Sequence, residues 1–252
     1  MIKTDLHVHT TYCDGKSTAE ETVLSAIEKG METVGFSGHS YTFFDESYCM
    51  SKEGTKAYRA EIDRLKAKYA DKIKVLCGIE QDYYSKESTD GYDNVIGSVH
   101  YLKINGVYLP VDENADILKK AVEKSFGGDW YRLTELYYET VAKVAERTKC
   151  DIIGHFDLIT KFNENGELFD TNNERYVSQW KTAVDRLLRF DVPFEINTGA
   201  ISRGYRTAPY PSKEIVDYIK QSSGKLTLSS DAHSADKLMY LFEKYENLLT
   251  AD

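Results

Sequence analysis

The histidines of this chain are few, and they stand at the ends of short apolar runs. Two of the six are His7 and His9, in the segment DLHVHTTYCDG near the start of the chain. The other four are His39 in SGHS, His100 in GSVHYL, His155 in IIGHFD and His233 in SSDAH. Residues two apart on a strand point to the same side, so His7 and His9 would present neighbouring imidazoles. Such a pair suits a transition metal such as zinc, iron or manganese.

Carboxylates accompany the histidines at these run ends. Glu80 ends the run IKVLCGIE, Asp231 precedes His233 by two residues, and Asp14 lies in the turn after the first run. Cys13, next to Asp14, is the alternative at that place. The candidate metal ligands are therefore His7, His9, Asp14, His39, Glu80, His100, His155, Asp231 and His233. This set exceeds the need of one ion, so we expect two or three divalent ions, zinc, iron or manganese, that share a bridging carboxylate.

The elements that must position these residues alternate along the chain. Seven short apolar runs predict buried strands at 3–9, 32–39, 73–80, 94–102, 150–159, 192–201 and 225–233. Stretches with helical periodicity lie at 53–71, 130–149, 173–190, 212–224 and around 240–248. The residues from Ser17 to Glu20 are typical of a capping box that starts a further helix, and Gly30 would end that helix.

This alternation predicts an α/β fold, a parallel closed barrel with an outer ring of helices, in a single domain of residues 1–252. An open, doubly wound sheet is the alternative. The segment 103–128 is the least regular, and we expect it to be an insertion near the site. In such barrels the carboxyl ends of the strands share one rim, where the active site lies. The rim would therefore gather the candidate ligands from distant parts of the chain.

Composition and charge disfavour several classes of function. The formal net charge is −9, so the surface should repel nucleic acid and anionic membranes. No apolar run approaches the roughly 18–20 residues that span a bilayer, and the segment MIKTDLHVH has no apolar signal core. Cys13, Cys49, Cys77 and Cys150 form no CxxC motif, which favours reduced thiols. We therefore expect a soluble cytoplasmic protein; the sequence leaves its oligomeric state open.

Seven motifs in order resemble the PHP (polymerase and histidinol phosphatase) family, and more closely its histidinol-phosphate phosphatase branch. They are DLHVHTTYCDG, SGHS, GIEQDY, GSVHYL, GHFDLITKF, EINTGAISRGYRTAPYPS and SSDAH, and they run from Thr4 to about Ser234. The resemblance implies a distorted, TIM-like (β/α)7 barrel with a centre of three metal ions. One ion would be held by His7, His9, Glu80 and Asp231. A second would be held by His100, His155 and a bridging Glu80, and the third by Asp14, His39 and His233.

A metal cluster of this kind is suited to the hydrolysis of a phosphate monoester, because bound ions lower the pKa of water and hold phosphoryl oxygens. A phosphatase also needs a cation near the free phosphoryl oxygens, and a guanidinium presents a planar fork suited to phosphate. Arg203 and Arg206 follow the sixth strand. The segment resembles the family pattern EINTxGxR but departs from it at GAISR, where the arginine comes one position later; the resemblance implies this role for Arg203. Lys161 is a further candidate. The expected catalytic residues are Arg203 together with Asp231 or His233 as proton donor to the leaving oxygen.

The resemblance implies L-histidinol phosphate as the substrate, in histidine biosynthesis. Acidic or aromatic side chains would receive its amine and imidazole, and the candidates are Glu113, Asp157, Tyr12 and Phe44. Within the same family, the alternative is a phosphoesterase that acts on nucleotides or on phosphotyrosine. An amidohydrolase-type deaminase also begins with HxH in a barrel, but it would not call for Arg203 or for so many ligands. A metal-bound domain without enzymatic activity is the remaining alternative.

Overall fold

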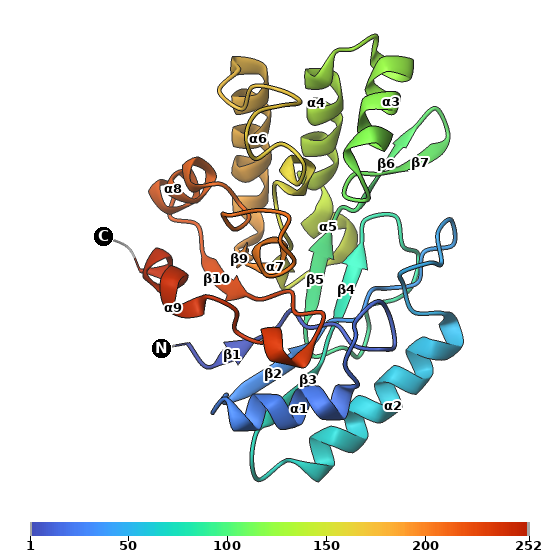
Figure 1. The fold of residues 1–252 in the computed structure, drawn as a ribbon, viewed down its shortest axis with the longest axis vertical. Helices are drawn as coiled ribbons and strands as arrows, with labels where there is room; N and C mark the ends of the chain where they lie inside the picture. Colours follow the sequence, from blue (N-terminus) through green and yellow to red (C-terminus); the bar gives the residue numbers. More distant parts are fainter. Residues whose placement is uncertain (1, 251–252) are drawn as a thin grey trace.

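Short parallel strands form two sheets in the computed structural model, which describes residues 2–250 (Figure 1). The first sheet has the order β1–β2–β3, with β1 at Thr4–Asp5, β2 at Thr33–Phe36 and β3 at Lys74–Cys77. The second has the order β10–β9–β8–β5–β4, with β4 at Ile79–Asp82, β5 at Val95–Ser98, β8 at Ile152–Ile153, β9 at Phe194–Asn197 and β10 at Leu226–Ser229. All neighbours in these two sheets are parallel.

Two junctions close these sheets into a ring. At the first, β3 and β4 are one strand interrupted only by Gly78, where no room exists for a Cβ, and a bridge between His39 and Glu80 continues the pairing. At the second, Val8 pairs with Ala232, which joins the end of β1 to the end of β10. With β3 and β4 counted as one, seven parallel strands surround the centre. The ring confirms the predicted (β/α)7 barrel and rules out the open, doubly wound sheet.

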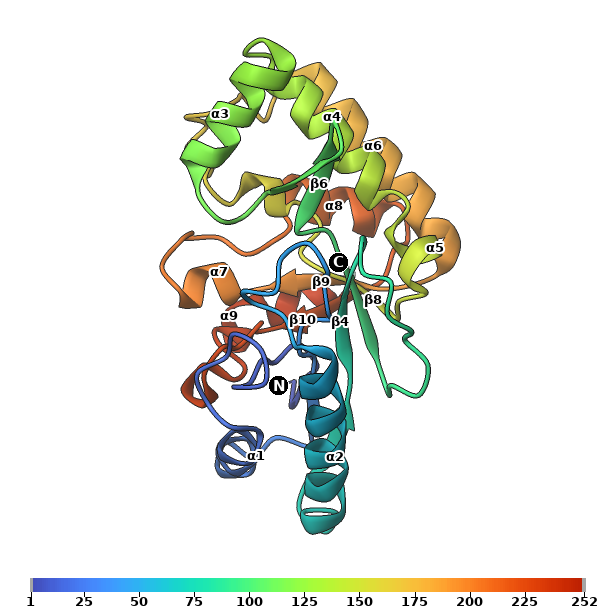
Figure 2. The same cartoon turned by 90° about the vertical axis from the view of Figure 1, so that its right-hand side faces the viewer.

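Helices cover the outside of the barrel (Figure 2). α1 (Ala19–Glu28) and α2 (Lys52–Lys68) pack on the three-stranded sheet, while α4 (Trp130–Val141) packs on α6 (Glu174–Leu187). α5 (Val144–Thr148) contacts β5, and α8 (Lys213–Gln221) contacts α6. The buried side of α6 consists of Tyr176, Trp180, Ala183, Val184 and Leu187. This is the spacing of a helix with one apolar face, and such faces bury the strands from outside.

The first helix begins one residue later than expected. Its N-cap is Thr18, whose hydroxyl accepts a hydrogen bond from the backbone N–H of Glu21, while the Glu21 carboxylate accepts one from the Thr18 N–H. This capping box replaces the expected pair of Ser17 and Glu20 and leaves Glu20 free to contact α2. Gly30 follows the helix with a φ of 69°, a conformation that glycine adopts without strain.

Two predicted elements divide, and one helix was not predicted. The run 94–102 contains β5 and the start of β6 (Tyr101–Ile104), and β6 pairs antiparallel with β7 (Val107–Pro110), which lies beyond the run. The stretch 130–149 breaks between α4 and α5. The segment 103–128, expected to be irregular, contains α3 (Ala115–Phe126), with Asn114 as its N-cap and Gly127 in the left-handed conformation at its end.

Short helical turns complete the chain between strands and at its end. They are η1 (Leu158–Thr160) after β8, η2 (Leu188–Phe190) after α6, α7 (Gly199–Ser202) after β9, and η3 (Ala235–Lys237) after β10. The helix predicted around 240–248 is present as α9 (Phe242–Tyr245) followed by η4 (Glu246–Leu249). Within residues 2–250, no helix is both long and apolar enough to cross a bilayer, and all four cysteines are free thiols.

Candidate metal centre

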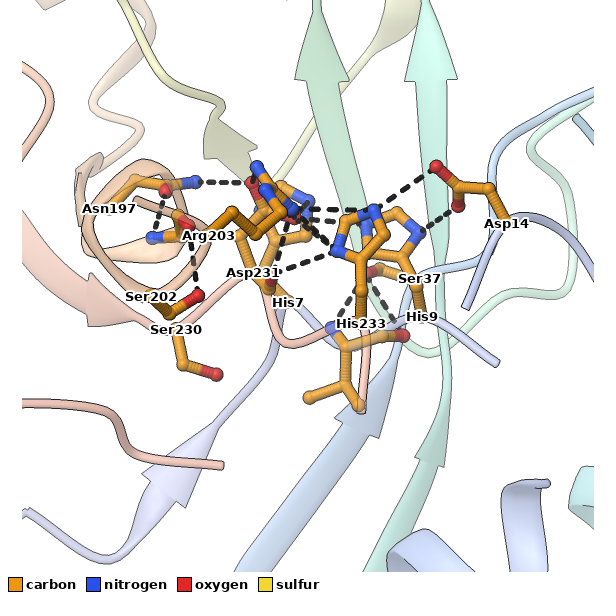
Figure 3. Close-up of polar contacts among 12 residues, drawn as sticks. His7, His9, Asp14, Ser37, Asn197, Ser202, Arg203, Ser230, Asp231 and His233 are labelled. Carbon is orange, nitrogen blue, oxygen red and sulfur yellow. Dashed lines mark hydrogen bonds and ion pairs between the residues drawn. The ribbon is translucent and has the colours of Figure 1, made fainter. Parts of the chain in front are cut away.

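The expected metal ligands converge at the carboxyl ends of the barrel strands. His7 and His9 follow β1, His39 follows β2, Glu80 lies on β4, and the remaining ligands come after β5, β8 and β10 or, for Asp14, from the loop before α1. Figure 3 shows Asp14 and Asp231 on either side of the rings of His9 and His233. Seven of the nine side chains belong to buried residues; Asp14 and His233 form the more exposed side of the cluster.

Glu80 lies at the middle of this cluster. Its two carboxylate oxygens lie 2.9 to 3.5 Å from a ring nitrogen of each of five histidines, which are His7, His9, His39, His100 and His155. The hydroxyl of Ser98 donates a hydrogen bond to Oε1 at 2.6 Å. One carboxylate therefore contacts five of the six imidazoles of the chain, which is the arrangement expected of a carboxylate shared between cations.

Asp14 and His233 close the exposed side of the cluster. Oδ2 of Asp14 lies 3.1 Å from Nε2 of His233, and its Oδ1 lies 3.6 Å from Nε2 of His39 and 3.7 Å from Nδ1 of His9. These four residues offer ligand atoms within 4.8 Å of one another. Cys13, the alternative to Asp14, contacts only Nδ1 of His9 among these rings, with its sulfur at 3.5 Å. The geometry therefore favours Asp14 as the donor at this place.

Asp231 occupies a position that requires a special backbone. Its Oδ1 lies 3.3 Å from Nε2 of His9 and 3.7 Å from Nε2 of His7, and its Oδ2 accepts a hydrogen bond from Nη2 of Arg203 at 3.1 Å. Its φ of 48° is in the left-handed region, which is strained for a residue other than glycine. Gly199 packs against it so closely that a Cβ there would lie 2.7 Å from the Asp231 Cβ. Both features keep this carboxylate at the cluster.

The donor set fits divalent cations. Five buried atoms of these ligands have no hydrogen-bond partner within the described part of the chain: Nε2 of His7 and of His9, Nδ1 of His100 and of His155, and Oε2 of Glu80. Buried polar atoms are rarely left unpaired. Two further groups have ligand atoms within 4.8 Å of one another. The first consists of His7, His9 and Glu80, and the second consists of His39, Glu80 and His100. Imidazole nitrogen and carboxylate oxygen together suit zinc, iron and manganese.

The charges of the cluster also suit metal binding. Burial alone would raise the pKa of Glu80, but the imidazoles of His39, His7 and His100 outweigh it and hold that pKa well below its usual range. Burial, together with the rings of His233 and His39, lowers the pKa of His9 to about 3. At neutral pH the carboxylate is ionised and this imidazole is neutral. Those are the states in which these two groups bind a metal ion. Burial would lower the pKa of His7, of His39 and of His100, but nearby carboxylates outweigh it. They raise the pKa of His7 and of His39 well above the ordinary value and that of His100 to about 10, so metal binding at these three rings would release protons.

Sequence reasoning missed a buried carboxylate that holds two of the ligands. Glu195 on β9 is fully buried; its Oε2 accepts a hydrogen bond from Nδ1 of His7 at 2.8 Å, and its Oε1 accepts one from the backbone N–H of His155. Ser229 and Asn197 donate to the same carboxylate. A carboxylate on the far ring nitrogen fixes the orientation and tautomer of a ligating histidine. The only signal in the sequence was an acidic residue inside the apolar run VPFEINTGAI.

A cavity of about 290 Å³ opens onto the cluster, and the candidate substrate contacts fall into three groups by the cavity that they line. Arg203, Lys161 and Glu113 line this cavity, and Nη1 of Arg203 donates to Nδ1 of His233 at 2.6 Å. Arg206 and Asp157 line a second cavity of about 610 Å³ instead. Tyr12 and Phe44 line neither cavity. The structure therefore brings Arg203 and Lys161 to the cluster and keeps Arg206 away from it.

The chain resembles known proteins over nearly its whole length. The family model described as PHP domain matches residues 5–199. A histidinol-phosphatase from Bacillus subtilis is 26% identical, with 97% of this chain and 98% of that protein covered. A crystal structure from Listeria monocytogenes, assigned as a histidinol phosphatase, has a TM-score of 0.82 at 22% identity. The match covers 96% of this chain and 100% of the Listeria monocytogenes chain. A histidinol phosphate phosphatase from Lactococcus lactis was solved with zinc, L-histidinol and phosphate. Its structure has a TM-score of 0.72 at 20% identity, and the match covers 98% of this chain and 92% of the Lactococcus lactis chain.

The two solved structures share the fold of this chain, and the family model covers most of its candidate ligands. Seven of the nine ligands lie within residues 5–199; Asp231 and His233 lie beyond that range but join the same cluster. The chain belongs to the PHP domain family.

Proposed function

We propose that this protein hydrolyses a phosphate monoester, L-histidinol phosphate, to L-histidinol and phosphate, a reaction of histidine biosynthesis, with two or three divalent ions of zinc, iron or manganese. One observation carries the proposal: the carboxylate of Glu80 contacts five imidazoles at the floor of a cavity that Arg203 and Lys161 also line. The candidate metal ligands and the positively charged side chains that could bind phosphate thus face the same cavity.

Three sets of residues would hold the ions. His7, His9, Glu80 and Asp231 form one set, Glu80 with His100 and His155 forms another, and Asp14, His39 and His233 form the third. Divalent ions bound there would supply a water nucleophile at neutral pH and neutralise charge on the phosphoryl oxygens. Glu195 supports this arrangement, since its hydrogen bond with Nδ1 of His7 aims Nε2 of that ring at the cluster.

The chain itself would bind and orient the phosphoryl group. The Arg203 guanidinium is fixed by Asp231 and by the ring of His233, and a fixed planar fork binds phosphoryl oxygens with little loss of freedom. Lys161 is held by the carbonyl of Asp112 at 2.7 Å and adds a second positive charge to the same cavity. The two side chains would grip the oxygens that do not face the metal ligands.

The leaving oxygen needs a proton, and the two candidates to deliver it are His233 and Asp231. Burial would raise the pKa of Asp231, but Arg203 and the neighbouring imidazoles outweigh it and hold that pKa well below its usual range. Asp231 could therefore pass on only a proton that it had first accepted from the attacking water. Asp231 and His233 both line the cavity, and both contact Arg203. Replacing the proton donor should slow hydrolysis of L-histidinol phosphate far more than that of p-nitrophenyl phosphate, because the second leaving group departs without a proton. Measuring both rates in D231N and H233Q, with metal content alongside, separates this role from metal binding.

The lining of the cavity supports a cationic, aromatic leaving group. Asp45 and Glu113 contribute carboxylates, and Tyr48 and Tyr101 contribute rings. Carboxylates near the mouth attract an ammonium or imidazolium group and repel the phosphates of a nucleotide. The Bacillus subtilis relative is named a histidinol-phosphatase, and the Lactococcus lactis protein was solved with L-histidinol and phosphate, which supports the same substrate here.

The test is phosphate release by the metal-loaded protein across a panel of L-histidinol phosphate, nucleoside monophosphates and phosphotyrosine. We expect the highest kcat/KM for L-histidinol phosphate, complete loss of activity on chelation, and recovery when zinc, iron or manganese is restored. R203M, which keeps the length of the side chain and removes its charge, should raise KM with its metal content unchanged.

Other outcomes assign other functions. Turnover of nucleotides or phosphotyrosine but not of L-histidinol phosphate would refute the substrate and retain the metal-dependent phosphatase. Release of ammonia from amino-substituted heterocycles, without phosphate release from any monoester, would indicate a deaminase. A metal-replete protein that turns over nothing in either assay would refute an enzymatic role.

A further inference from the structure

The two cations proposed to bind phosphate stand on different segments of the chain. Lys161 is the C-cap residue of η1, after β8, and Arg203 is the C-cap residue of α7, after β9. Both side chains line the first cavity. They can grip one phosphoryl group only at a fixed separation, because a misplacement of ~1 Å in a site can reduce the rate on the order of 100-fold. A connection between the two segments would therefore bear directly on phosphate binding.

A buried arginine connects the segment after α7 to η1. Arg206 is only 7% exposed, and its Nη1 donates to the backbone carbonyl of Thr160 at 2.8 Å and to the Thr160 hydroxyl at 2.7 Å. Thr160 is the residue directly before Lys161. The guanidinium also lies over the ring of Tyr210, 4.7 Å from its centre. Arg206 therefore fixes the backbone from which Lys161 extends.

A glutamate makes the reciprocal connection. Glu164, three residues after Lys161, accepts hydrogen bonds from the backbone N–H groups of Thr207 and Ala208, both at 2.9 Å, and from the Thr207 hydroxyl at 3.1 Å. Hydrogen bonds with a charged partner are roughly twice as strong as neutral ones. Each segment thus sends one charged side chain onto the backbone of the other; we call Arg206 and Glu164, with these contacts, the brace.

The brace lies behind the substrate cations and not beside them. Lys161 and Arg203 line the first cavity, whereas Thr160, Glu164 and Arg206 line the second. Arg206 and Glu164 are not among the residues that line the first cavity. We therefore expect Arg206 to act on phosphate through the segments that it joins, and R206K, which keeps the charge, separates this from a purely electrostatic effect. This distinguishes Arg206 from Arg203, which lies three residues earlier.

We propose that Arg206 and Glu164 are positioning residues that set the separation of Lys161 and Arg203 and so determine how tightly the phosphoryl group is bound. The inference rests on the proposed function, because it takes Lys161 and Arg203 as phosphate contacts. The brace acts on phosphate affinity and leaves the metal ligands in place, since Arg206 and Glu164 contact none of the nine ligands in any hydrogen bond or ion pair found among residues 2–250.

The test measures binding of inorganic phosphate to the metal-loaded chain by calorimetry, which needs no turnover, together with kcat and KM. R206M should weaken phosphate binding and raise KM about tenfold, with a smaller change in kcat and unchanged metal content. R206K, which keeps one charged donor, should recover part of the loss. E164Q should act in the same direction and less strongly, and it provides the test if R206M does not fold.

A double-variant background separates positioning from a general loss of stability. In the K161M/R203M protein, R206M should weaken phosphate binding no further, because the cations that it positions are gone. K181M is the matched control, since Lys181 also lines the second cavity but lies outside the brace; it should bind phosphate normally. A full additional effect in the double variant, or a lowered Tm with unchanged phosphate affinity in R206M and E164Q, would overturn the proposal.

The failure of this inference differs from failure of the proposed function. If the protein releases phosphate from no monoester but R206M still weakens phosphate binding and K181M does not, the function is wrong and the brace stands. If L-histidinol phosphate is hydrolysed and R206M leaves both phosphate affinity and KM unchanged, the brace is wrong and the function stands. Wild-type protein that binds no inorganic phosphate would refute the premise of the brace.

Discussion

Two glutamates of this protein each gather several partners, and they differ in what those partners are. The carboxylate of Glu20 on α1 accepts hydrogen bonds from Lys68, Arg64 and Tyr69 at 2.5 to 2.8 Å, and its side chain is 31% exposed. The side chain of Glu80 is 1% exposed, and five imidazoles surround it at 2.9 to 3.5 Å. Both clusters join elements that are distant in the sequence.

The two clusters differ in whether each partner donates a hydrogen and in whether solvent reaches the charges. Each partner of Glu20 brings its own donated hydrogen, so that pairing is complete, and solvent screens the charges. Around Glu80 several ring nitrogens and one carboxylate oxygen have no hydrogen-bond partner among residues 2–250, and burial makes unpaired polar atoms costly. The surface cluster has all its hydrogen bonds within the protein, whereas the buried cluster leaves ligand atoms free for cations. Burial and donor type separate the two; the number of partners does not.

The substitution E80Q tests this contrast most severely. The carboxamide keeps the size of the side chain but removes the charge that the imidazoles and the ions share. We expect loss of at least one bound ion and a fall in kcat of roughly 10³-fold, because a catalytic metal contributes several kcal/mol and each 1.4 kcal/mol corresponds to a factor of ten. Metal content and phosphate release measure both effects. E20Q is the matched control, and E80Q with full metal and normal turnover would contradict the role of Glu80.

The substitution E195Q tests how much the Glu195 carboxylate, which contacts the ligands from behind, contributes to metal affinity. Glu195 fixes the ring of His7 and the backbone of His155, so its loss should weaken metal binding by about 10–100-fold. Titration of the chelated protein with zinc measures the affinity. Activity should return at saturating zinc, which distinguishes E195Q from E80Q. An unchanged zinc affinity would mean that Glu195 serves only the packing of the barrel.

The substitution D14N probes the exposed side of the cluster. Asp14 is 33% exposed at its side chain and contacts His233, His39 and His9. Because solvent reaches this side, the loss should be smaller, roughly tenfold in activity, with a decrease in bound metal of no more than one ion per chain. Metal analysis after gel filtration checks this. C13A, beside it, should retain full metal; the opposite ranking would identify Cys13 as the ligand.

The substitution E20Q should have the smallest effect, and the size of that effect depends on pH. Hydrogen bonds from Lys68, Tyr69 and Arg64 lower the pKa of Glu20 to about 2. Because this folded-state pKa lies below the ordinary value, the cluster stabilises the fold above about pH 4.5 and loses that contribution as the pH falls toward 2. E20Q should therefore lower Tm slightly at pH 7, and the difference should shrink below pH 4.5. A difference in Tm that does not change with pH would contradict this account.

The barrel and most of the cluster were predictable because their signals are local. Apolar runs marked each barrel strand, and His7, His9 and Glu80 stood at run ends, which a parallel barrel brings to one rim. The weaker predictions concerned boundaries. The box expected at Ser17 formed one residue later, since the register of a capping box depends on which hydroxyl reaches the helix N–H groups. The helix α3 was overlooked although Asn114 and Gly127 are ordinary cap residues.

The features that escaped prediction depend on contacts between distant residues. The alternation of residues on β9 does not reveal that Glu195 meets His7, which precedes it by 188 positions. Arg203 and Arg206 have the same chemistry and lie three residues apart, yet one lines the cavity at the cluster and the other lines the second cavity. The direction of each side chain follows from the turn after α7 and from the buried carbonyl of Thr160, neither of which the local sequence specifies.

Val8 and Ala232 pair across almost the whole chain, with His7 and His9 beside one and Asp231 and His233 beside the other. During synthesis the early imidazoles leave the ribosome long before position 233 is translated. Since chains emerge N-terminus first, a nascent polypeptide cannot assemble its full set of ligands until β10 has also emerged. The candidate metal centre can therefore be completed only after residues 231–233 have left the ribosome, whatever partial sites form earlier.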